Sequence, residues 1–479
     1  MQTTSLDTTQ PEQARSDNTS SRSHLAKALA LAAMSLGLGV VQLDITIVNT
    51  ALSSIGTSLG GSVAELQWVV TAYTITFAAF ILTAGALGDR LGAKRIFIAG
   101  FAIFTLASLA CALAPSAMFL IAARAVQGLG AAILVPNSLT LLNHAYADPK
   151  ARGRAVGIWA AGAAAALTAG PFVGGVLIAL VGWRLIFLVN LPIGAAGLWL
   201  AWRYAEETPR LAQREIDLPG QIAAITALGV LAGALIEGGA LGWSHPLAIG
   251  GFAAAAVAGL LFVWREARAP QPMLPLSLFS HRLFALSALV GLLFNIAFYG
   301  LIFVLSLYFQ KVNAWSPFAT GLAFVPMMAM VLPANLVTAS VSERLGAPQT
   351  IALASVITAA GCVALLPVAP GMSYWAIGAQ LVVLGGGLGL LVPSLTSTLL
   401  GSVEKSRSGI AAGVLNATRQ TGSVLGVALF GSLVGGDHPS DDLGTGAFIA
   451  GAHASLVISA GVLLAGAVAI LCGRARESR

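Results

Sequence analysis

Residues 85–95 read GALGDRLGAKR and lie between two long apolar segments of the chain. This stretch places four charged side chains among three glycines. A short charged turn between membrane spans holds two helices close together, and its charges can pair in one state of the protein and separate in another. We therefore predict a conformational gating loop made of Gly85, Asp89, Arg90, Gly92, Lys94 and Arg95.

The composition excludes a soluble fold. Of 479 residues, 57% are hydrophobic and 9% are charged, whereas soluble domains carry about 25% charged residues. Lipid must therefore be the solvent for most of the surface. The net charge of +6 does not indicate a nucleic-acid partner, because the basic residues lie singly in short loops. The three cysteines fall in apolar segments without the spacing of a metal site or a disulfide framework.

Fourteen apolar segments are long enough, at about 20 residues each, to cross a bilayer as helices. They cover residues 27–52, 66–87, 96–114, 118–142, 155–179, 184–203, 219–237, 246–264, 283–309, 317–340, 349–368, 373–399, 409–434 and 450–472. With a cytoplasmic N-terminus, 21 of the 25 basic residues fall on the cytoplasmic side. Only Arg184 and Lys311 lie outside, while Arg124 and Arg419 lie within spans. This positive-inside bias predicts that both termini are cytoplasmic.

An internal repeat divides the chain into two halves. The pattern Gly128-x-Gly130 followed by Leu-Val-Pro136 recurs 257 residues later (393 − 136) and ends at Pro393. A repeat at this separation predicts two parallel halves related by an axis along the membrane normal. We expect an all-α integral membrane protein with the following parts: a disordered cytoplasmic tail at 1–24, a six-helix bundle at 25–204, a linker with two extra helices at 205–282, a second six-helix bundle at 283–473 and a cytoplasmic tail at 474–479.

Asp44 and Arg124 are ionisable residues inside predicted spans. A charge in hydrocarbon is costly, so such residues are functional candidates by default. They lie 8 and 6 residues from the outer ends of their spans, or about 12 and 9 Å deep at ~1.5 Å per residue. We hypothesise that Arg124 alternately pairs with and releases a group near Asp44, with Gln127 in the same network. The alternatives are an Asp44 that caps a neighbouring helix and a permanent ion pair that fixes helix packing.

Two further sets of residues are candidates for transport roles. Small residues and a proline in the fifth span let helices approach closely and permit a bend; they are Gly157, Gly170, Pro171, Gly174 and Gly175. Amide, aromatic and basic side chains could line an apolar cavity with a few polar groups; they are Gln67, Trp68, Tyr73, Asn295, Tyr299 and Arg419. Most aromatic residues in such helices pack or face lipid, and Arg419 could equally be structural.

No enzyme or nucleotide site is visible. The chain contains no GxxxxGK[ST] sequence, which removes ATP as a direct energy source and leaves an ion gradient. The histidines are scattered, and no Ser–His–Asp or HExxH arrangement occurs. We expect no enzymatic activity, no metal and no cofactor other than a coupling proton.

These motifs together resemble a fourteen-helix member of the drug:proton antiporter branch of the major facilitator superfamily, over residues 25–473. Matching positions outside the gating loop are Asp44 to Ala51, Arg124, Gln127, Gly128, Gly130, Gly157, Gly170, Pro171, Gly174, Gly175, Trp183, Arg184, Phe187, Asn190 and Pro192. Ser53 stands where this family usually has proline, and Ala93 where it has a basic residue.

The resemblance implies proton-driven export by alternating access, in which the two halves rock about a central cavity. Protonation of Asp44 from outside would break its pairing. The implied substrates are amphipathic small molecules such as antibiotics, and neutral or monocationic compounds fit a chain whose only plainly buried acid is Asp44. The implied location is the bacterial cytoplasmic membrane, with the chain acting as a monomer and without nucleic acid. Alternatives are a dedicated exporter of one metabolite and, less favoured, a receptor or channel.

Overall fold

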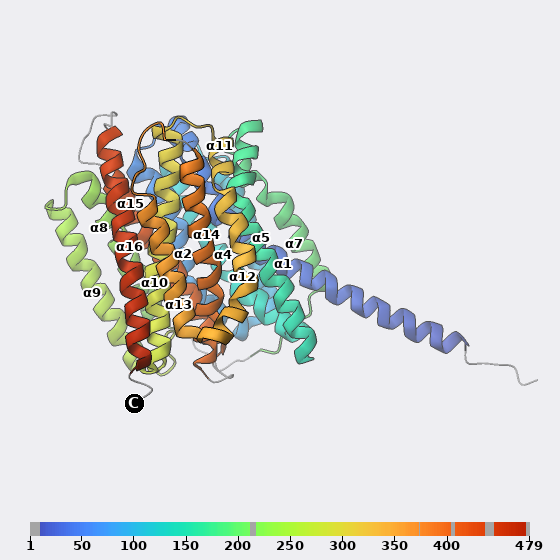
Figure 1. The fold of residues 1–479 in the computed structure, drawn as a ribbon. Coiled ribbons are helices and arrows are strands. Elements are labelled where there is room, and N and C mark those ends of the chain that lie inside the picture. Colours follow the sequence, from blue (N-terminus) through green and yellow to red (C-terminus); the bar gives the residue numbers. More distant parts are fainter. Residues whose placement is uncertain (1–9, 211–216, 373, 404–407, 436–444, 476–479) are drawn as a thin grey trace, which may run out of the picture.

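The computed structural model describes residues 10–210, 217–372, 374–403, 408–435 and 445–475, and Figure 1 shows their arrangement. Within these ranges all regular structure is helical. The described helices cross the molecule fourteen times, which confirms the predicted all-α membrane fold. Each apolar helix can cross a membrane because its own hydrogen bonds satisfy the backbone.

The elements follow the predicted order of six crossings, two crossings and six crossings. The first bundle contains α1 (Gln10–Leu59), α2 (Val63–Leu91), α3 (Ala93–Ala112), α4 (Ala117–Ala145), α5 (Pro149–Leu180) and a crossing split into α6 (Leu185–Leu188) and α7 (Asn190–Tyr204). The inserted pair is α8 (Leu218–Leu241) and α9 (Pro246–Arg268). The second bundle contains η1 (Leu276–Ser280), α10 (Arg282–Leu307), η2 (Tyr308–Val312), α11 (Pro317–Ala323), α12 (Val325–Leu345), α13 (Ala347–Ala364), α14 (Tyr374–Gly401), α15 (Ser408–Gly435) and α16 (Thr445–Ala475).

Two elements differ from the sequence prediction. Helix α1 begins at Gln10, so residues 10–24 of the predicted disordered tail continue the first span as helix, and residues 1–9 lie outside the described part. The predicted tail at 474–479 also lies largely outside it. Of the helices in the described part of the chain, thirteen are apolar enough to cross a membrane by length and composition, and α15 is not among them. Helix α15 carries Asn416, Arg419 and Gln420, and it lies between α10, α2 and α8, where protein replaces lipid around it.

The molecule has two ends, which we name after glycines in their turns. The Gly60 end carries the α1–α2 turn, where Gly60 has a φ of +66° and Ser62 forms a capping box with Glu65. The Gly92 end carries the α2–α3 turn, where Gly92 has a φ of +103°. A left-handed backbone of this kind favours glycine.

The two bundles are joined closely in the half that leads to the Gly60 end. There Gln67 of α2 donates hydrogen bonds from Nε2 to the carbonyls of Val427 (3.0 Å) and Ala428 (2.8 Å) of α15. Ser306 of α10 donates from Oγ to the carbonyl of Asn49 of α1 at 2.6 Å. These contacts join α2 to α15 and α1 to α10, two helices from each half, so the protein is closed at this end.

The inserted helices lie on one flank of the molecule, at the left of Figure 1. Helix α8 contacts α2 of the first bundle and α15 of the second, while α9 packs on α8. Gln221 of α8 donates from Nε2 to the carbonyl of Ala79 at 2.8 Å, and its Oε1 accepts from the Thr83 hydroxyl. The pair therefore covers the seam between α2 and α15.

Candidate functional site

A buried ion pair lies in the middle of the first bundle. Asp44 of α1 and Arg124 of α4 are 0% and 1% exposed, and Arg124 donates from Nη1 to Asp44 Oδ2 at 2.5 Å. Arg124 Nη1 also donates to Gln127 Oε1 at 2.6 Å. Pairing and full hydrogen bonding are what make such a buried charge tolerable. The structure thus brings together the three predicted proton-coupling residues.

The second oxygen of Asp44 is held by amides. Its Oδ1 accepts from Gln127 Nε2 at 2.8 Å and from Asn190 Nδ2 at 3.2 Å. Gln127 and Asn190 also donate to the hydroxyl of Ser108, at 2.8 and 3.3 Å. Both carboxylate oxygens are therefore satisfied by neighbours on α4 and α7, as expected for a charged group without access to water.

Arg124 also contacts α2. Its Nε donates to the carbonyl of Val69 at 3.1 Å. Its guanidinium carbon lies 4.2 Å from the centroid of the Tyr73 ring and 5.8 Å from that of Phe187. Such cation–π contacts stabilise a desolvated guanidinium. Arg124 therefore joins α1, α4 and α2 at one point.

The predicted gating loop at residues 85–95 is held by residues that follow α7. The backbone N–H of Ala93 donates to Thr208 Oγ1 at 3.0 Å, and that of Lys94 donates to Glu207 Oε1 at 2.9 Å. These bonds satisfy free N–H groups at the start of α3. Arg95 Nε lies 3.7 Å from Glu207 Oε2, and an added Cβ at Gly92 would stand 2.7 Å from Glu207 Oε1. Glycine at position 92 is thus favoured by its φ, and a side chain there would displace the Glu207 carboxylate from its place on the loop.

The α5 motif packs tightly on α1. A Cβ added at Gly174 would stand 2.9 Å from Ile47 Cγ1, and one at Gly170 would stand 3.2 Å from the Ile47 nitrogen. Pro171 lacks the N–H that would bond to the carbonyl of Leu167. The hydroxyl of Thr46 donates to that carbonyl at 3.0 Å instead, so α5 continues through the proline without an unsatisfied group.

The same motif contacts the other half of the protein. A Cβ at Gly175 would stand 2.8 Å from the carbonyl oxygen of Pro317 of α11, and one at Gly321 would stand 3.3 Å from the Phe172 Cα. Gly157 differs from the prediction of close packing: it is exposed, and a Cβ there would meet nothing within 4 Å. Gly157 lies in the part of α5 that leads to the Gly92 end, where the halves are apart.

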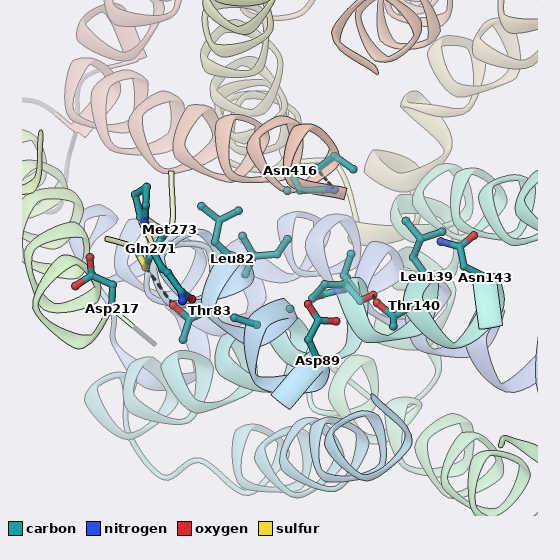
Figure 2. A pocket seen from close by; sticks show the side chains of 18 of the residues that line it. Leu82, Thr83, Asp89, Leu139, Thr140, Asn143, Asp217, Gln271, Met273 and Asn416 are labelled. Atoms are coloured by element: carbon teal, nitrogen blue, oxygen red, sulfur yellow. Dashed lines mark hydrogen bonds between the residues drawn. The ribbon is translucent and has the colours of Figure 1, made fainter. Parts of the chain in front are cut away.

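A cavity of about 430 Å³ lies between the halves on the side of the Gly92 end (Figure 2). It is lined by the Gly92 halves of α2 and α4, by the start of α15, by Trp159 of α5 and by Asp217 and the segment 271–273. Its described lining has two carboxylates, Asp89 and Asp217, and no lysine or arginine. Gly85 and Asp89 of the gating loop thus form part of its wall.

The six predicted cavity residues lie elsewhere. Tyr73 packs on Arg124, and Gln67 bonds to α15 at the closed end. Trp68 is half-buried and packs against α8, where a Cβ added at Gly233 would lie 3.5 Å from the Trp68 ring. Residues of the second bundle are likewise absent from the described lining of this cavity; they are Asn295, Tyr299 and Arg419. Asn416, one helical turn before Arg419, does line it.

Several contributors were not among the predicted site residues. Asn190, Glu207 and Asp217 each act through a partner distant in sequence, and Gly321 meets α5 from the other half. Asn190 had one signal in the sequence, because it belongs to the matched start of the sixth span. The Asp-Leu-Pro sequence at 217–219 is a helix-start signal, but it does not indicate a cavity.

Comparison with known proteins agrees with the fold and the motifs. The sequence model of the Major Facilitator Superfamily matches residues 34–427. The chain is 39% identical over 390 residues to the methylenomycin A resistance protein of Bacillus subtilis, covering 81% of this chain and 83% of that protein. It is 37% identical over 386 residues to the multidrug resistance protein Stp of Mycobacterium tuberculosis, covering 81% and 72%.

Solved structures agree at the level of the fold. The human organic anion transporter MFSD10 matches with a TM-score of 0.62 at 16% identity, covering 94% of this chain and 99% of that one. The nucleoside transporter NupG matches with a TM-score of 0.63 at 13% identity, covering 93% and 99%. The family match and the bacterial relatives decide the assignment: the chain belongs to the major facilitator superfamily and is similar to its drug efflux transporters.

Proposed function

We propose that this protein exports amphipathic small molecules, antibiotics among them, in exchange for protons by alternating access. The observation that carries the proposal is the buried network in which Asp44 is held by Arg124, Gln127 and Asn190. An ionisable group that is fully enclosed in a membrane bundle and paired with a single cation is suited to bind and release a proton. The relatives named for drug resistance support the export direction.

We assign the Gly92 end to the cytoplasm. The support is the distribution of basic residues, 21 of 25 on that side, together with the positive-inside rule. Both termini are then cytoplasmic, in a bacterial cytoplasmic membrane. The cavity on the Gly92 side then faces the cytoplasm and the closed Gly60 end faces outward, so the conformation is inward-facing.

The proton acts on the charge balance at Arg124. In the inward-facing form Asp44 is a carboxylate that accepts three hydrogen bonds. When the Gly60 end opens and substrate leaves, a proton from outside binds Asp44, and the ion pair with Arg124 loses its Coulomb attraction. Return to the inward-facing form re-forms the pair and releases the proton to the cytoplasm. The proton is the only co-substrate, and no bond in the exported molecule is broken.

One chain supplies both bundles, the proton site and the cavity, so we propose that the monomer transports. A second candidate is a dedicated exporter of one endogenous antibiotic or metabolite. The support is that relatives carry single-compound names, such as the puromycin resistance protein of Streptomyces alboniger, 32% identical over 391 residues. The two candidates share the mechanism and differ in substrate range.

The test is efflux from cells that lack their own pumps, with and without a protonophore. A panel of dyes and antibiotics is compared for wild type and Asp44→Asn, which keeps the side-chain shape but cannot change charge. We expect protonophore-sensitive efflux that is lost in Asp44→Asn at normal membrane expression. Asp148→Asn is the matched control, because Asp148 is an exposed cap at the start of α5. Normal efflux in Asp44→Asn would refute the role of Asp44, and efflux of a single compound would favour the dedicated exporter.

A further inference from the structure

We propose that the inserted helices α8 and α9 add a cation-binding subsite to the cavity wall, formed by the carboxylates of Asp217 and Glu266. The subsite would take the positive group of an amphipathic organic cation while the rest of the molecule occupies the cavity. This inference rests on the proposed function, in that the cavity is taken as the place where substrate binds.

Asp217 belongs both to a helix cap and to the cavity. It is 7% exposed and lines the cavity next to Gln271 and Met273 (Figure 2). Its Oδ1 accepts from the backbone N–H of Gly220 at 3.0 Å and from Arg265 Nε at 3.0 Å. Its Oδ2 is buried and has no hydrogen-bond partner. The cap and the ion pair therefore use one oxygen and leave the other unused.

Glu266 brings a second carboxylate to the same place. It is 3% exposed, and its Oε2 accepts from the backbone N–H of Leu274 at 2.8 Å. Its Oε1 is buried without a partner. A Cβ added at Gly220 would stand 2.7 Å from Glu266 Oε1 and 3.0 Å from Asp217 Oδ2. The two unpartnered oxygens thus converge on one point beside Gly220.

Among the described residues beside Gly220, the charges do not balance. Two carboxylates, of Asp217 and Glu266, face one guanidinium, that of Arg265, which forms its ion pair with Asp217. A buried carboxylate without a partner cation is costly. A bound cation would offset this cost, and the absence of lysine and arginine from the described lining leaves the cavity open to one.

The surroundings favour an organic cation over a metal ion. No group of three or more His, Cys, Asp or Glu that could hold a metal occurs in the part of the chain that the structure describes. Met273 lies beside Asp217 in Figure 2, and the cavity wall also includes the apolar side chains of Leu82, Leu139 and Trp159. Apolar walls around a few polar groups suit an amphipathic ligand. The simpler alternative is that Asp217 only caps the start of α8, and this role needs its Oδ1 but not its Oδ2.

This difference separates the two roles experimentally. Asparagine caps a helix about as well as aspartate, so Asp217→Asn keeps the cap and removes the charge. Glu266→Gln likewise keeps an acceptor for Leu274. Asp148→Asn is the control, because Asp148 caps α5 by accepting from Ala151 at 2.7 Å and is exposed outside the cavity.

The experiment is equilibrium binding to the purified full chain in lipid nanodiscs, without a proton gradient. The probes are tetraphenylphosphonium, a monocation, and triphenylphosphine oxide, a neutral compound of similar shape. We expect the Kd for tetraphenylphosphonium to rise about tenfold in Asp217→Asn and in Glu266→Gln, a change of about 1.4 kcal/mol. The neutral probe should bind all four proteins equally, and Asp148→Asn should match wild type for both probes.

Three results would overturn the subsite: no binding of tetraphenylphosphonium by wild type, an unchanged Kd in both carboxylate variants, or an equal loss for the neutral probe. If Asp217→Asn unfolds, Glu266→Gln decides alone. The binding assay needs no transport. If wild type shows protonophore-sensitive efflux but binding is unchanged in the carboxylate variants, the subsite alone is refuted. If binding depends on the two carboxylates but wild type shows no efflux, the proposed function alone is refuted.

Discussion

Replacing Gln67 by leucine removes the polar contact that holds α2 against α15 at the Gly60 end. Gln67 is 2% exposed, and its Nε2 donates to the carbonyls of Val427 and Ala428. Leucine has a similar volume and no donor. A hydrogen bond contributes a net ~0.5–1.5 kcal/mol in proteins and averages ~0.6 kcal/mol between membrane helices. Loss of both bonds should therefore destabilise the closed end by about 1–2 kcal/mol.

That free energy changes the balance between closed and open forms. The carbonyls of Val427 and Ala428 lie within α15 and keep their helical bonds, so the variant leaves no acceptor stranded and the loss stays near this size. A change of 1–2 kcal/mol is a factor of about 5–30. A closed-to-open ratio of about 100 to 1 would fall to between about 20 to 1 and about 3 to 1.

The assay is a pulsed electron paramagnetic resonance distance across the Gly60 end. Spin labels at Ser58→Cys and Ser316→Cys report opening, since both positions are exposed on different halves. Cys472 is exposed and is replaced by alanine, while Cys111 and Cys362 are buried. We expect Gln67→Leu to add a population at longer distance.

Gln221→Leu is the matched control for this measurement. Gln221 is also buried and also donates to a helix carbonyl, that of Ala79, but it joins α8 to α2 near the Gly92 end. Its replacement should leave the label distances unchanged. A distance distribution in Gln67→Leu identical to that of wild type, at an unchanged unfolding temperature, would refute the claim that Gln67 holds the Gly60 end closed.

Two further predictions concern the proposed proton site and α5. Arg124→Lys keeps the charge but loses the planar fork that bonds Asp44 and Val69 together, so proton-driven efflux should fall at least about tenfold at normal expression, or ~1.4 kcal/mol; wild-type efflux would leave Arg124 a packing role only. Thr46→Val strands the Leu167 carbonyl and should cost about 1–3 kcal/mol, read as a lower unfolding temperature. In a Pro171→Ala background the backbone N–H at 171 can serve that carbonyl, so an equal drop in both backgrounds would contradict this account.

The sequence predicts the fold well because membrane crossing is decided by local properties. Run length and the distribution of basic residues need no knowledge of packing. They predict fourteen spans, and thirteen of the described helices are apolar enough by length and composition, with α15 the exception. The pairing of Asp44 with Arg124 follows from similar depth and from the cost of an unpaired charge. Depth along a helix can be counted in residues, so this part of the candidate site was predictable.

The neighbour that a side chain faces around its helix could not be predicted by counting residues. Gln67 and Tyr73 are six residues apart on α2 and were both expected in a substrate cavity. Gln67 faces α15 and Tyr73 faces Arg124, because α2 is surrounded by protein on several sides. Glu207 and Asp217 lie in or beside the link between α7 and α8, and their partners are set by how the chain folds back on α3 and α9. No periodic pattern records such contacts.

Helix α2 connects the proposed proton site at Asp44 and Arg124 to the contacts that close the Gly60 end. Arg124 is bound on one side by Asp44 of α1 and on the other by the carbonyl of Val69 of α2. Gln67, which holds α15, precedes Val69 by two residues. A proton on Asp44 weakens the first of these bonds and leaves the second in place, so the guanidinium is then held more by α2 than by α1. A buried guanidinium must keep its acceptors. Any shift of Arg124 therefore pulls on the segment of α2 that carries Gln67 and its bonds to α15. Protonation of Asp44 and the closure of the Gly60 end are thus linked through one short stretch of α2, residues 67–73, which contacts both Arg124 and α15.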